Sequence, residues 1–416
     1  MFRSVVAYLP LGRRRGTHRN LQRHASCHFA GRLEKMNALH CPGGLFALTL
    51  MFSSGLPAAT PEIVHQFLGP MPTGVTVSKA GRIFVNFPRW GDAVDFTVGE
   101  IRDGKVVPFP DADLNQPEMA KQADRLISVQ SVVVDPRDRL WILDTGSIQF
   151  GKTTYGGPKL VGIGLGNKRI FKKILFPADV ALPTTYLNDV RFDLSRGSEG
   201  FAYITDSGEQ SPNGLIVVDL ASGKSWRRLS GHPSVKPDPA FTAVVEGQEL
   251  WNVAPSGKKT KWALGSDGIA IDPARRLLYY SPLSGRHLYS VNLDLLSDPR
   301  RTEAEVEKSV ADLGDKGGAS DGLECDAEGR VYASDYEHNL IRRRDRDGKW
   351  QTVAQDPRML WPDTLSLVGG YLYFTCNQLE RQKQFHGGRD LRVQPYLLFR
   401  IPTDGQPARP DQRSSR

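Results

Sequence analysis

The chain has 416 residues, of which 39% are hydrophobic, and it contains 41 glycines and 28 prolines. This composition supports a core that is stable without disulfide bonds and is typical of short strands joined by many turns. The formal charge of +8 arises mainly from residues 1–35, which hold eight basic residues and one acid. The rest of the chain is close to neutral, which excludes a broad surface for nucleic acid. Four cysteines are too few for a disulfide framework.

Residues 1–59 are predicted to form a basic leader that contains a signal peptide. Leu45–Phe52 is a short apolar stretch, and small residues follow it up to Ala59. The stretch is too short to cross a bilayer, so we predict no membrane span. Basic residues before such a stretch and small residues after it are typical of secretory signals. The sequence therefore predicts a secreted or periplasmic protein, with an N-terminal tail that lacks fixed structure as the alternative.

A short motif recurs six times along the rest of the chain: a small polar residue precedes an apolar strand that usually ends in Asp. The copies begin at Pro72, Val129, Leu187, Ser266, Ser320 and Pro362. Each is followed by a turn and by an aromatic-rich second strand, and most continue into a third and a fourth. Repetition of a unit made only of strands indicates a radial arrangement. The sequence predicts an all-β fold, a six-bladed β-propeller of four-stranded blades around a central channel, over residues 60–405.

The sequence also predicts how the first and last parts of the propeller are arranged. The last repeat stops at its third strand, near Ile401, and a propeller that did not join its ends would leave exposed sheet edges. We predict that Glu62–Phe67 supplies the missing outer strand. One helix is predicted over Arg300–Val310, with Asp298 as its N-cap. Residues 406–416 are predicted to be a disordered tail.

The second position of each repeat holds a polar side chain, and these six side chains would form a ring around one channel. They are Thr73, Gln130, Asn188, Asp267, Asp321 and Asp363. Each hairpin returns the chain to its starting end, so residues after the second strands would lie at the same mouth. These are Phe87, Arg89, Trp90, Asp144, Asp206, Asp335 and Asn377. An aromatic wall beside carboxylates suits a small catecholic or indolic amine.

From this ring we predict a ligand-binding set and a metal set. The ligand-binding set is Thr73, Gln130, Asn188, Asp267, Asp363, Phe87 and Asn377. Asn188, Asp267, Asp321 and Asp363 could supply four oxygen ligands to a divalent cation such as Ca²⁺, since crowded carboxylates require either a cation or protonation. The metal set is narrowed to Asn188, Asp267 and Asp321 by a family resemblance described below. The alternatives are that each Asp caps its own strand and that Phe87 packs between blades. Gly162–Gly166 falls on a strand with no helix after it, so no nucleotide or organic cofactor is predicted.

Several linked stretches resemble a known family. Ile127–Gly146, Tyr186–Val190 and Trp361–Leu365 are similar to stretches of the yellow and major royal jelly protein family. The chain resembles the bacterial members that are described as related to dopachrome tautomerases. This resemblance implies a six-bladed propeller, usually secreted, with a ligand pocket at one end of the channel. The family includes proteins that convert dopachrome and others that bind biogenic amines without converting them.

Ser266–Asp272 and Ser320–Asp326 also resemble inner strands of the gluconolactonase and senescence-marker propellers. That resemblance implies a divalent cation held by a first-blade Glu and by Asn or Asp residues of later blades. Asn188, Asp267 and Asp321 match the later ligands, whereas Thr73 stands where the Glu would be. By this resemblance Asp321 is the candidate catalytic residue, both metal ligand and general base.

The function predicted is that of a propeller with a small-molecule pocket at one end of its channel, tautomerase-like on quinonoid or indolic compounds. Two alternatives stay open. One is a metal-dependent hydrolase of the lactonase type. The other is a non-catalytic binder of small aromatic amines.

Overall fold

The computed structural model describes residues 58–411. Residues 1–57 of the predicted leader (1–59) and the last five residues of the predicted tail (412–416) lie outside the described residues. The end of the predicted leader, Ala59, is described, and its N–H donates to the Val353 carbonyl at 2.7 Å. None of the helices among the described residues is long and apolar enough to cross a membrane.

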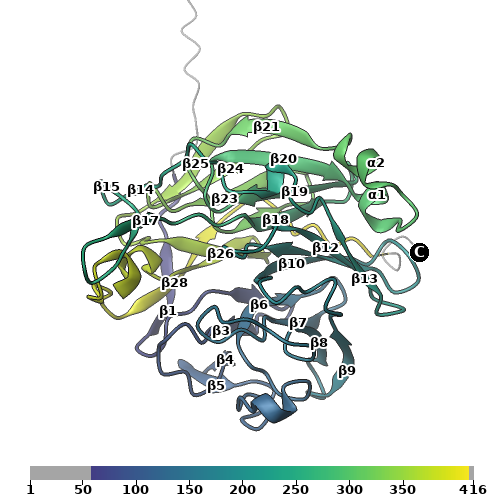
Figure 1. Ribbon diagram of the computed structural model, residues 1–416, viewed down its shortest axis with the longest axis horizontal. Coiled ribbons are helices and arrows are strands. Elements are labelled where there is room, and N and C mark those ends of the chain that lie inside the picture. Colours follow the sequence, from purple (N-terminus) through teal and green to yellow (C-terminus); the bar gives the residue numbers. More distant parts are fainter. Residues whose placement is uncertain (1–57, 412–416) are drawn as a thin grey trace, which may run out of the picture. The chain divides into compact units, whose positions relative to one another are not determined.

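Six four-stranded antiparallel sheets follow one another in chain order and form the blades of a β-propeller, as predicted (Figure 1). From the inner to the outer strand, the first three blades are β2 (Val75–Val77), β3 (Ile83–Asn86), β4 (Val98–Arg102) and β5 (Lys105–Pro108); β6 (Val129–Val134), β7 (Arg139–Asp144), β8 (Lys159–Gly164) and β9 (Ile170–Leu175); and β10 (Leu187–Asp193), β11 (Phe201–Asp206), β12 (Gly214–Asp219) and β13 (Ser225–Arg228).

The remaining three blades are β18 (Ser266–Asp272), β19 (Leu277–Pro282), β20 (His287–Asn292) and β21 (Ala311–Asp315); β22 (Leu323–Cys325), β23 (Val331–Asp335), β24 (Leu340–Arg344) and β25 (Trp350–Gln355); and β26 (Pro362–Val368), β27 (Tyr371–Cys376), β28 (Tyr396–Pro402) and β1 (Glu62–Phe67). Each inner strand contacts the inner strands of both neighbouring blades, and β26 contacts β2. The six inner strands therefore surround one channel.

The last blade is completed by the N-terminal strand, as the sequence predicted. β1 pairs antiparallel with β28, from Glu62 opposite Arg400 to Phe67 opposite Tyr396. In Figure 1 the purple β1 lies beside the yellow β28. This pairing covers the sheet edge that β28 would otherwise expose, so the closure of the ring joins the two ends of the propeller.

The aspartate that ends most inner strands stabilises the turn that follows. Asp135 accepts hydrogen bonds from the Arg137 and Arg139 N–H groups at 2.9 and 3.1 Å and forms an ion pair with the Arg139 guanidinium. Asp326 and Arg330 repeat this ion pair in the fifth blade. The recurrent Asp of the motif is therefore a turn residue, as expected of a short side chain that bonds nearby backbone N–H groups.

Neighbouring blades pack through aromatic side chains. Trp141 of β7 stacks on Phe192 of β10, with ring centroids 5.1 Å apart. Between the fifth and sixth blades, Tyr336 stacks on Trp361 at 4.0 Å. These contacts bury large apolar surfaces between the sheets and set the angle at which each blade meets the next.

The structure adds elements that the repeat did not predict. Two hairpins stand between the third and fourth blades: β14 (Val244–Val245) with β15 (Gln248–Glu249), and β16 (Trp251–Val253) with β17 (Lys259–Lys261). Short helices are η1 (Met119–Lys121), η2 (Pro233–Val235), α1 (Leu293–Ser297), α2 (Glu303–Glu307), η3 (Leu379–Arg381) and η4 (Lys383–Phe385).

The predicted helix is shorter than expected and starts later. Its N-cap is Thr302 and not Asp298, because Thr302 and Glu305 form a reciprocal capping box. The expected span Arg300–Val310 is reduced to the five residues of α2.

The predicted disordered tail is ordered as far as it is described. The Ala327 N–H donates to the Gln406 carbonyl (2.7 Å), and the Leu194 N–H donates to the Pro410 carbonyl (2.9 Å). Asp411 forms an ion pair with Arg137 at 3.0 Å. Residues 406–411, which we call the strap, thus run from the fifth blade to the second and third. A tail is ordered where its backbone finds hydrogen-bond partners, and those partners lie far away in the sequence.

Candidate functional site

One end of the channel opens into a cavity of ≈ 200 Å³, which we call the upper cavity. Five of the six ring residues line it: Gln130, Asn188, Asp267, Asp321 and Asp363. The sixth, Thr73, is fully buried, and its hydroxyl donates to the Gln130 carbonyl at 3.3 Å. Thr73 therefore contacts the backbone of the ring and not the cavity.

A shift in strand pairing turns four of these side chains toward the channel. The register between inner and second strands changes at Val129/Ser131, Leu187/Val190, Ser266/Ile269 and Pro362/Leu365. Each interval contains one ring residue, in the same order Gln130, Asn188, Asp267 and Asp363. Such irregularities leave a residue without a cross-strand partner and re-aim its side chain, and they are common beside functional sites.

A chain of hydrogen bonds runs along one side of the ring. The Trp90 indole donates to the Tyr186 hydroxyl (2.7 Å), which donates to Gln130 Oε1 (3.1 Å). Gln130 Nε2 donates to Asn188 Oδ1 at 3.1 Å, and Asn188 Nδ2 donates to Asp267 Oδ2 at 2.5 Å. Burial raises the pKa of Tyr186, so its hydroxyl remains a donor. Each hydrogen bond in this chain is donated towards Asp267, so Asp267 is the final acceptor.

The other side of the ring brings three carboxyl groups together. Asp321 interacts through its side chain with both Asp267 and Asp363, and its Oδ2 accepts the Trp361 indole N–H at 2.7 Å. Asp363 accepts from the Asn377 amide at 2.7 Å. Asn377 is fully buried and thus supports Asp363 without lining the cavity.

Burial changes the acidity of all three carboxyl groups. It raises the pKa of Asp321 to about 7. Burial, with the neighbouring charge of Asp321, also raises the pKa of Asp267 and of Asp363 well above the ordinary value. Adjacent buried carboxylates cannot all ionise, so the trio retains protons near neutral pH and titrates as one cluster.

The indole that holds Asp321 has an unusual backbone. Trp361 is fully buried and has φ +53°, in the left-handed region that bulky side chains rarely adopt. Such a conformation costs free energy and persists where the surrounding structure requires it, often at functional sites. Here it places the indole N–H against Asp321.

Aromatic side chains form one wall of the upper cavity. Trp90 stacks on Phe150 with ring centroids 5.1 Å apart, and Phe150 lies 5.2 Å from the Tyr186 ring. Phe150 is 53% exposed, so much of its ring is available to a ligand. Trp262, which follows β17, lines the cavity from another direction and packs edge-on against Trp361 at 5.8 Å.

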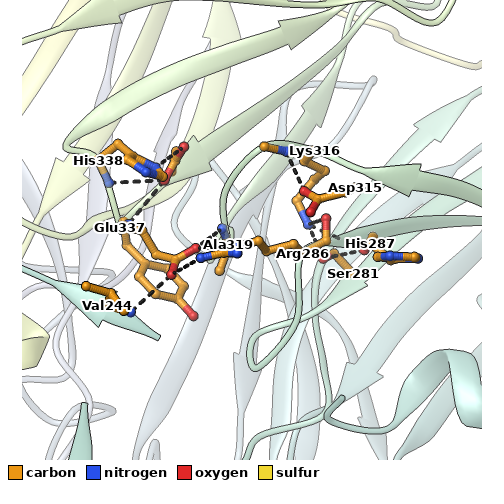
Figure 2. Close-up of polar contacts among 12 residues, drawn as sticks. Val244, Ser281, Arg286, His287, Asp315, Lys316, Ala319, Glu337 and His338 are labelled. Atoms are coloured by element: carbon orange, nitrogen blue, oxygen red, sulfur yellow. Dashed lines mark hydrogen bonds and ion pairs between the residues drawn. The ribbon is translucent and has the colours of Figure 1, made fainter. Parts of the chain in front are cut away.

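The segment that carries Trp262 is anchored by a buried carboxylate. Glu337 accepts from the Val244 N–H (3.1 Å), from the Ala319 N–H (2.9 Å) and from the Arg286 guanidinium (2.7 Å), as Figure 2 shows. Burial opposes ionisation of Glu337, but these donors outweigh it and lower its pKa. Glu337 thus ties the β14–β15 hairpin to the fourth and fifth blades.

Lys316 lies close to this anchor and is almost completely buried (Figure 2). Its ammonium donates to Ser281 Oγ (2.8 Å) and to the Arg286 carbonyl (2.9 Å). Burial lowers the pKa of Lys316 to about 7. It does not line the upper cavity, and its contacts serve to join β19 and β20 to the segment after β21.

The residues after the second strands mostly have structural contacts. Phe87, predicted as a ligand contact, is buried against Phe67 at 5.8 Å and Phe96 at 6.1 Å, outside the upper cavity. Asp144, Asp206 and Asp335, expected near the mouth, are fully buried. Each accepts backbone N–H groups of nearby loops and pairs with a cation. Of this group, Trp90 lines the cavity as expected.

Three aromatic residues that line the cavity were not predicted to lie near it: Phe150, Tyr186 and Trp262. Tyr186 directly precedes an inner strand, within a stretch that carries the family resemblance, so a signal for it existed. Phe150 and Trp262 lie in connections between strands. No repeating sequence pattern there predicts which way a side chain faces.

The predicted metal set does not fit a calcium ion as it is arranged. The Asn188 amide oxygen already accepts from Gln130, and its amino group faces Asp267, where a cation would require an oxygen. Within residues 58–411, no group of three or more His, Cys, Asp or Glu side chains is placed to hold a metal ion. We therefore derive no step through a metal.

The fold and this site define a six-bladed β-propeller with an aromatic and acidic cavity at one mouth of its channel. The sequence model of the major royal jelly protein family matches residues 127–393. The chain belongs to this family, as its sequence suggested.

Individual proteins that match this chain share about a third or less of its residues in the aligned region. Protein yellow of Drosophila erecta is 30% identical over 256 residues, which cover 58% of this chain and 44% of that protein. Protein yellow of Drosophila melanogaster is 29% identical over the same length, again 58% of this chain and 44% of its own. The chain thus spans less than half the length of the curated relatives it matches.

Solved structures with similar folds are only weakly related in sequence. A calcium-binding protein, regucalcin, from Agrobacterium tumefaciens is 15% identical with a TM-score of 0.48, covering 85% of this chain and 99% of that one. A gluconolactonase from Xanthomonas campestris is 13% identical with a TM-score of 0.47, covering 83% and 95%. Similarity at this level does not extend to chemistry.

Proposed function

We propose that this protein binds a small aromatic molecule, quinonoid or indolic and carrying an amine, in the upper cavity and catalyses its tautomerisation. The observation that carries the proposal is that the aromatic wall of Trp90, Phe150 and Tyr186 and three buried carboxyl groups line the same cavity. Aromatic rings favour a flat ligand and a cation, and carboxylates pair with a protonated amine. The cavity of ≈ 200 Å³ is small, which favours a ligand of one or two rings.

The carboxyl trio supplies both partners of a proton transfer. A group whose pKa is about 7 is divided between its two protonation states at neutral pH, which suits general acid and base catalysis. In the proposed reaction ionised Asp321 takes a proton from a ring carbon of the ligand, while a protonated neighbour, Asp267 or Asp363, donates a proton to the ligand oxygen. One C–H bond breaks and one O–H bond forms, with no net redox change.

We further propose that the protein acts outside the cytoplasm, secreted or periplasmic. The composition of residues 1–59 supports this, with its basic stretch, short apolar segment and small residues. Sequencing the N-terminus of the protein from extracellular and cytosolic fractions tests it, since an intact leader on all of the protein in the cytosol would contradict export.

The proposed activity is tested by incubating the purified protein with dopachrome-like and indolic compounds and following their absorbance. Turnover above the uncatalysed rate is expected. Binding without turnover would instead support the non-catalytic alternative, in which the same wall and carboxylates hold an amine. Absence of both binding and turnover across these compounds would contradict the proposal.

The role of the wall gives a prediction of its own. Phe150→Leu should weaken binding of an aromatic amine by about 2–10-fold, the loss expected from one aromatic contact. Phe171→Leu is the matched control, because Phe171 is similarly exposed (43%) but lies on the outer strand β9. Calorimetric titration of both variants measures the effect. Equal affinities in the two variants would exclude Phe150 from the site.

The effect of calcium on the protein tests the alternative of a metal-dependent, lactonase-type hydrolase. Because the donor set does not fit the ion, treatment with a chelator should leave the Tm and the affinity for aromatic amines unchanged. Differential scanning fluorimetry with EDTA and with added Ca²⁺ checks this. A Ca²⁺-dependent rise in Tm that disappears in Asp267→Asn would contradict our interpretation and favour a metal-dependent enzyme.

A further inference from the structure

The channel contains a second cavity at the end closed by the strap. This lower chamber has a volume of ≈ 80 Å³, and its lining includes Thr76, Arg191, Glu324, Ser366 and Arg409. Arg409 belongs to the strap, whereas the other four belong to inner strands or directly follow them. The chamber is therefore a composite of the propeller and its C-terminal segment, separate from the upper cavity.

Two guanidinium groups in the chamber have donors without acceptors. Arg191 is 7% exposed; its Nη1 donates to the Val190 carbonyl (2.9 Å) and its Nη2 to the Leu323 carbonyl (2.7 Å). Its Nε is buried and has no hydrogen-bond partner among the described residues, and the same holds for Nη1 of Arg409. Buried guanidinium N–H groups without acceptors are costly, so binding of an acceptor in the chamber would be favourable.

The acidic groups nearby are engaged elsewhere. Glu324 Oε1 accepts the Cys325 N–H at 2.9 Å, and Asp189 Oδ1 accepts the Ser131 hydroxyl at 3.2 Å. Asp189 Oδ2 lies 4.0 Å from Arg191 Nη1, a long ion pair. Burial raises the pKa of both Glu324 and Asp189, while the nearby charges of Arg191 and Arg409 act to lower that of Glu324. Glu324 therefore partly balances the two guanidinium charges, but it accepts no hydrogen bond from either of the unpaired N–H groups.

We propose that the lower chamber binds a small oxyanion, of carboxylate or phosphate type, between Arg191 and Arg409. Guanidinium groups prefer such anions, because planar N–H donors match two oxygens of one acceptor. A ligand held by both residues links the strap to the third blade. Anion binding therefore fastens the strap across the closed end of the channel.

The test measures thermal stability in acetate, phosphate and chloride at equal ionic strength, in wild type and in Arg409→Gln. Acetate or phosphate should raise the wild-type Tm by about 2 °C or more relative to chloride, because a ligand that binds only the folded state stabilises it. Arg409→Gln should lose this difference. Arg300→Gln, whose side chain is 88% exposed outside the chamber, is the matched control and should keep it.

A second measurement does not depend on any variant. The Leu194 and Ala327 amides donate to strap carbonyls, so their hydrogen exchange in the wild type should slow in acetate or phosphate. If neither anion changes Tm or exchange beyond the effect of chloride, the chamber holds only water and the proposal is wrong. An equal rise of Tm in wild type and Arg409→Gln would place the anion elsewhere and would also overturn it.

Discussion

Replacing Asp321 by asparagine should lower turnover of a quinonoid or indolic substrate by about 10²–10⁴-fold, the usual contribution of a general acid or base. The amide keeps the shape of the side chain and an oxygen for the Trp361 indole, which donates to Asp321 at 2.7 Å. It cannot accept a proton from carbon. Affinity for the substrate should change far less than turnover, because the aromatic wall is intact. Steady-state kinetics with the purified variant measures both.

The pH dependence distinguishes a general base from a residue with only a structural role. Because burial raises the pKa of Asp321 to about 7, wild-type turnover should rise with pH through that value as the carboxyl group ionises. Asp321→Asn should lack this limb. Full turnover in Asp321→Asn, or an unchanged pH profile, would contradict the assignment.

Ionisation of Asp321, which should raise turnover, should lower the stability of the folded protein. The folded pKa of Asp321 lies above the ordinary aspartate value of 3.8, so between about pH 4 and 7 the native state binds more protons than the unfolded chain. The free energy of unfolding should therefore fall as pH rises through this window. Asp321→Asn should reduce that fall, and urea denaturation at the two ends of the window checks the slope.

Replacing Lys159 by methionine should destabilise the protein by about 3–5 kcal/mol, the usual cost of removing one partner of a buried ion pair. Lys159 lies 2.7 Å from Asp144, and their side chains are 1% and 0% exposed. Asp144 also accepts the N–H groups of Ile127 and Ser128, at 2.7 and 2.9 Å. Without the ammonium, its carboxylate stays buried and loses its ion-pair partner. Chemical denaturation measures the loss.

Two further variants interpret that result. Lys224→Met is the control, since Lys224 is an exposed turn residue of the third blade and its replacement should have little effect. Adding Asp144→Asn to Lys159→Met should recover part of the stability, because the carboxylate that has lost its ion-pair partner is removed. A loss below about 1 kcal/mol in Lys159→Met would show that water compensates Asp144.

Features that depend on neighbouring residues were predictable from the sequence. Alternating apolar strands, turns such as Pro136–Arg139 and the recurrent Asp are local patterns, so the six blades followed from them. The closure by Glu62–Phe67 also followed, because a propeller requires its edges to be paired. The ring positions were predictable for the same reason, since each occupies one fixed place in the repeat.

Only the tertiary structure decided which side chains share a space. Phe87 and Trp90 lie three residues apart, yet Phe87 is buried between blades and Trp90 faces the upper cavity. Phe150 and Trp262 reach that cavity from connections whose path no sequence period indicates. The strap is ordered by backbone partners at Leu194 and Ala327, far from it in sequence. Local sequence patterns determine strands and turns, because these depend on short-range steric preferences and on the alternation of apolar and polar residues. The acidity of the carboxyl trio and the lining of both cavities arise only when distant segments come together and exclude water.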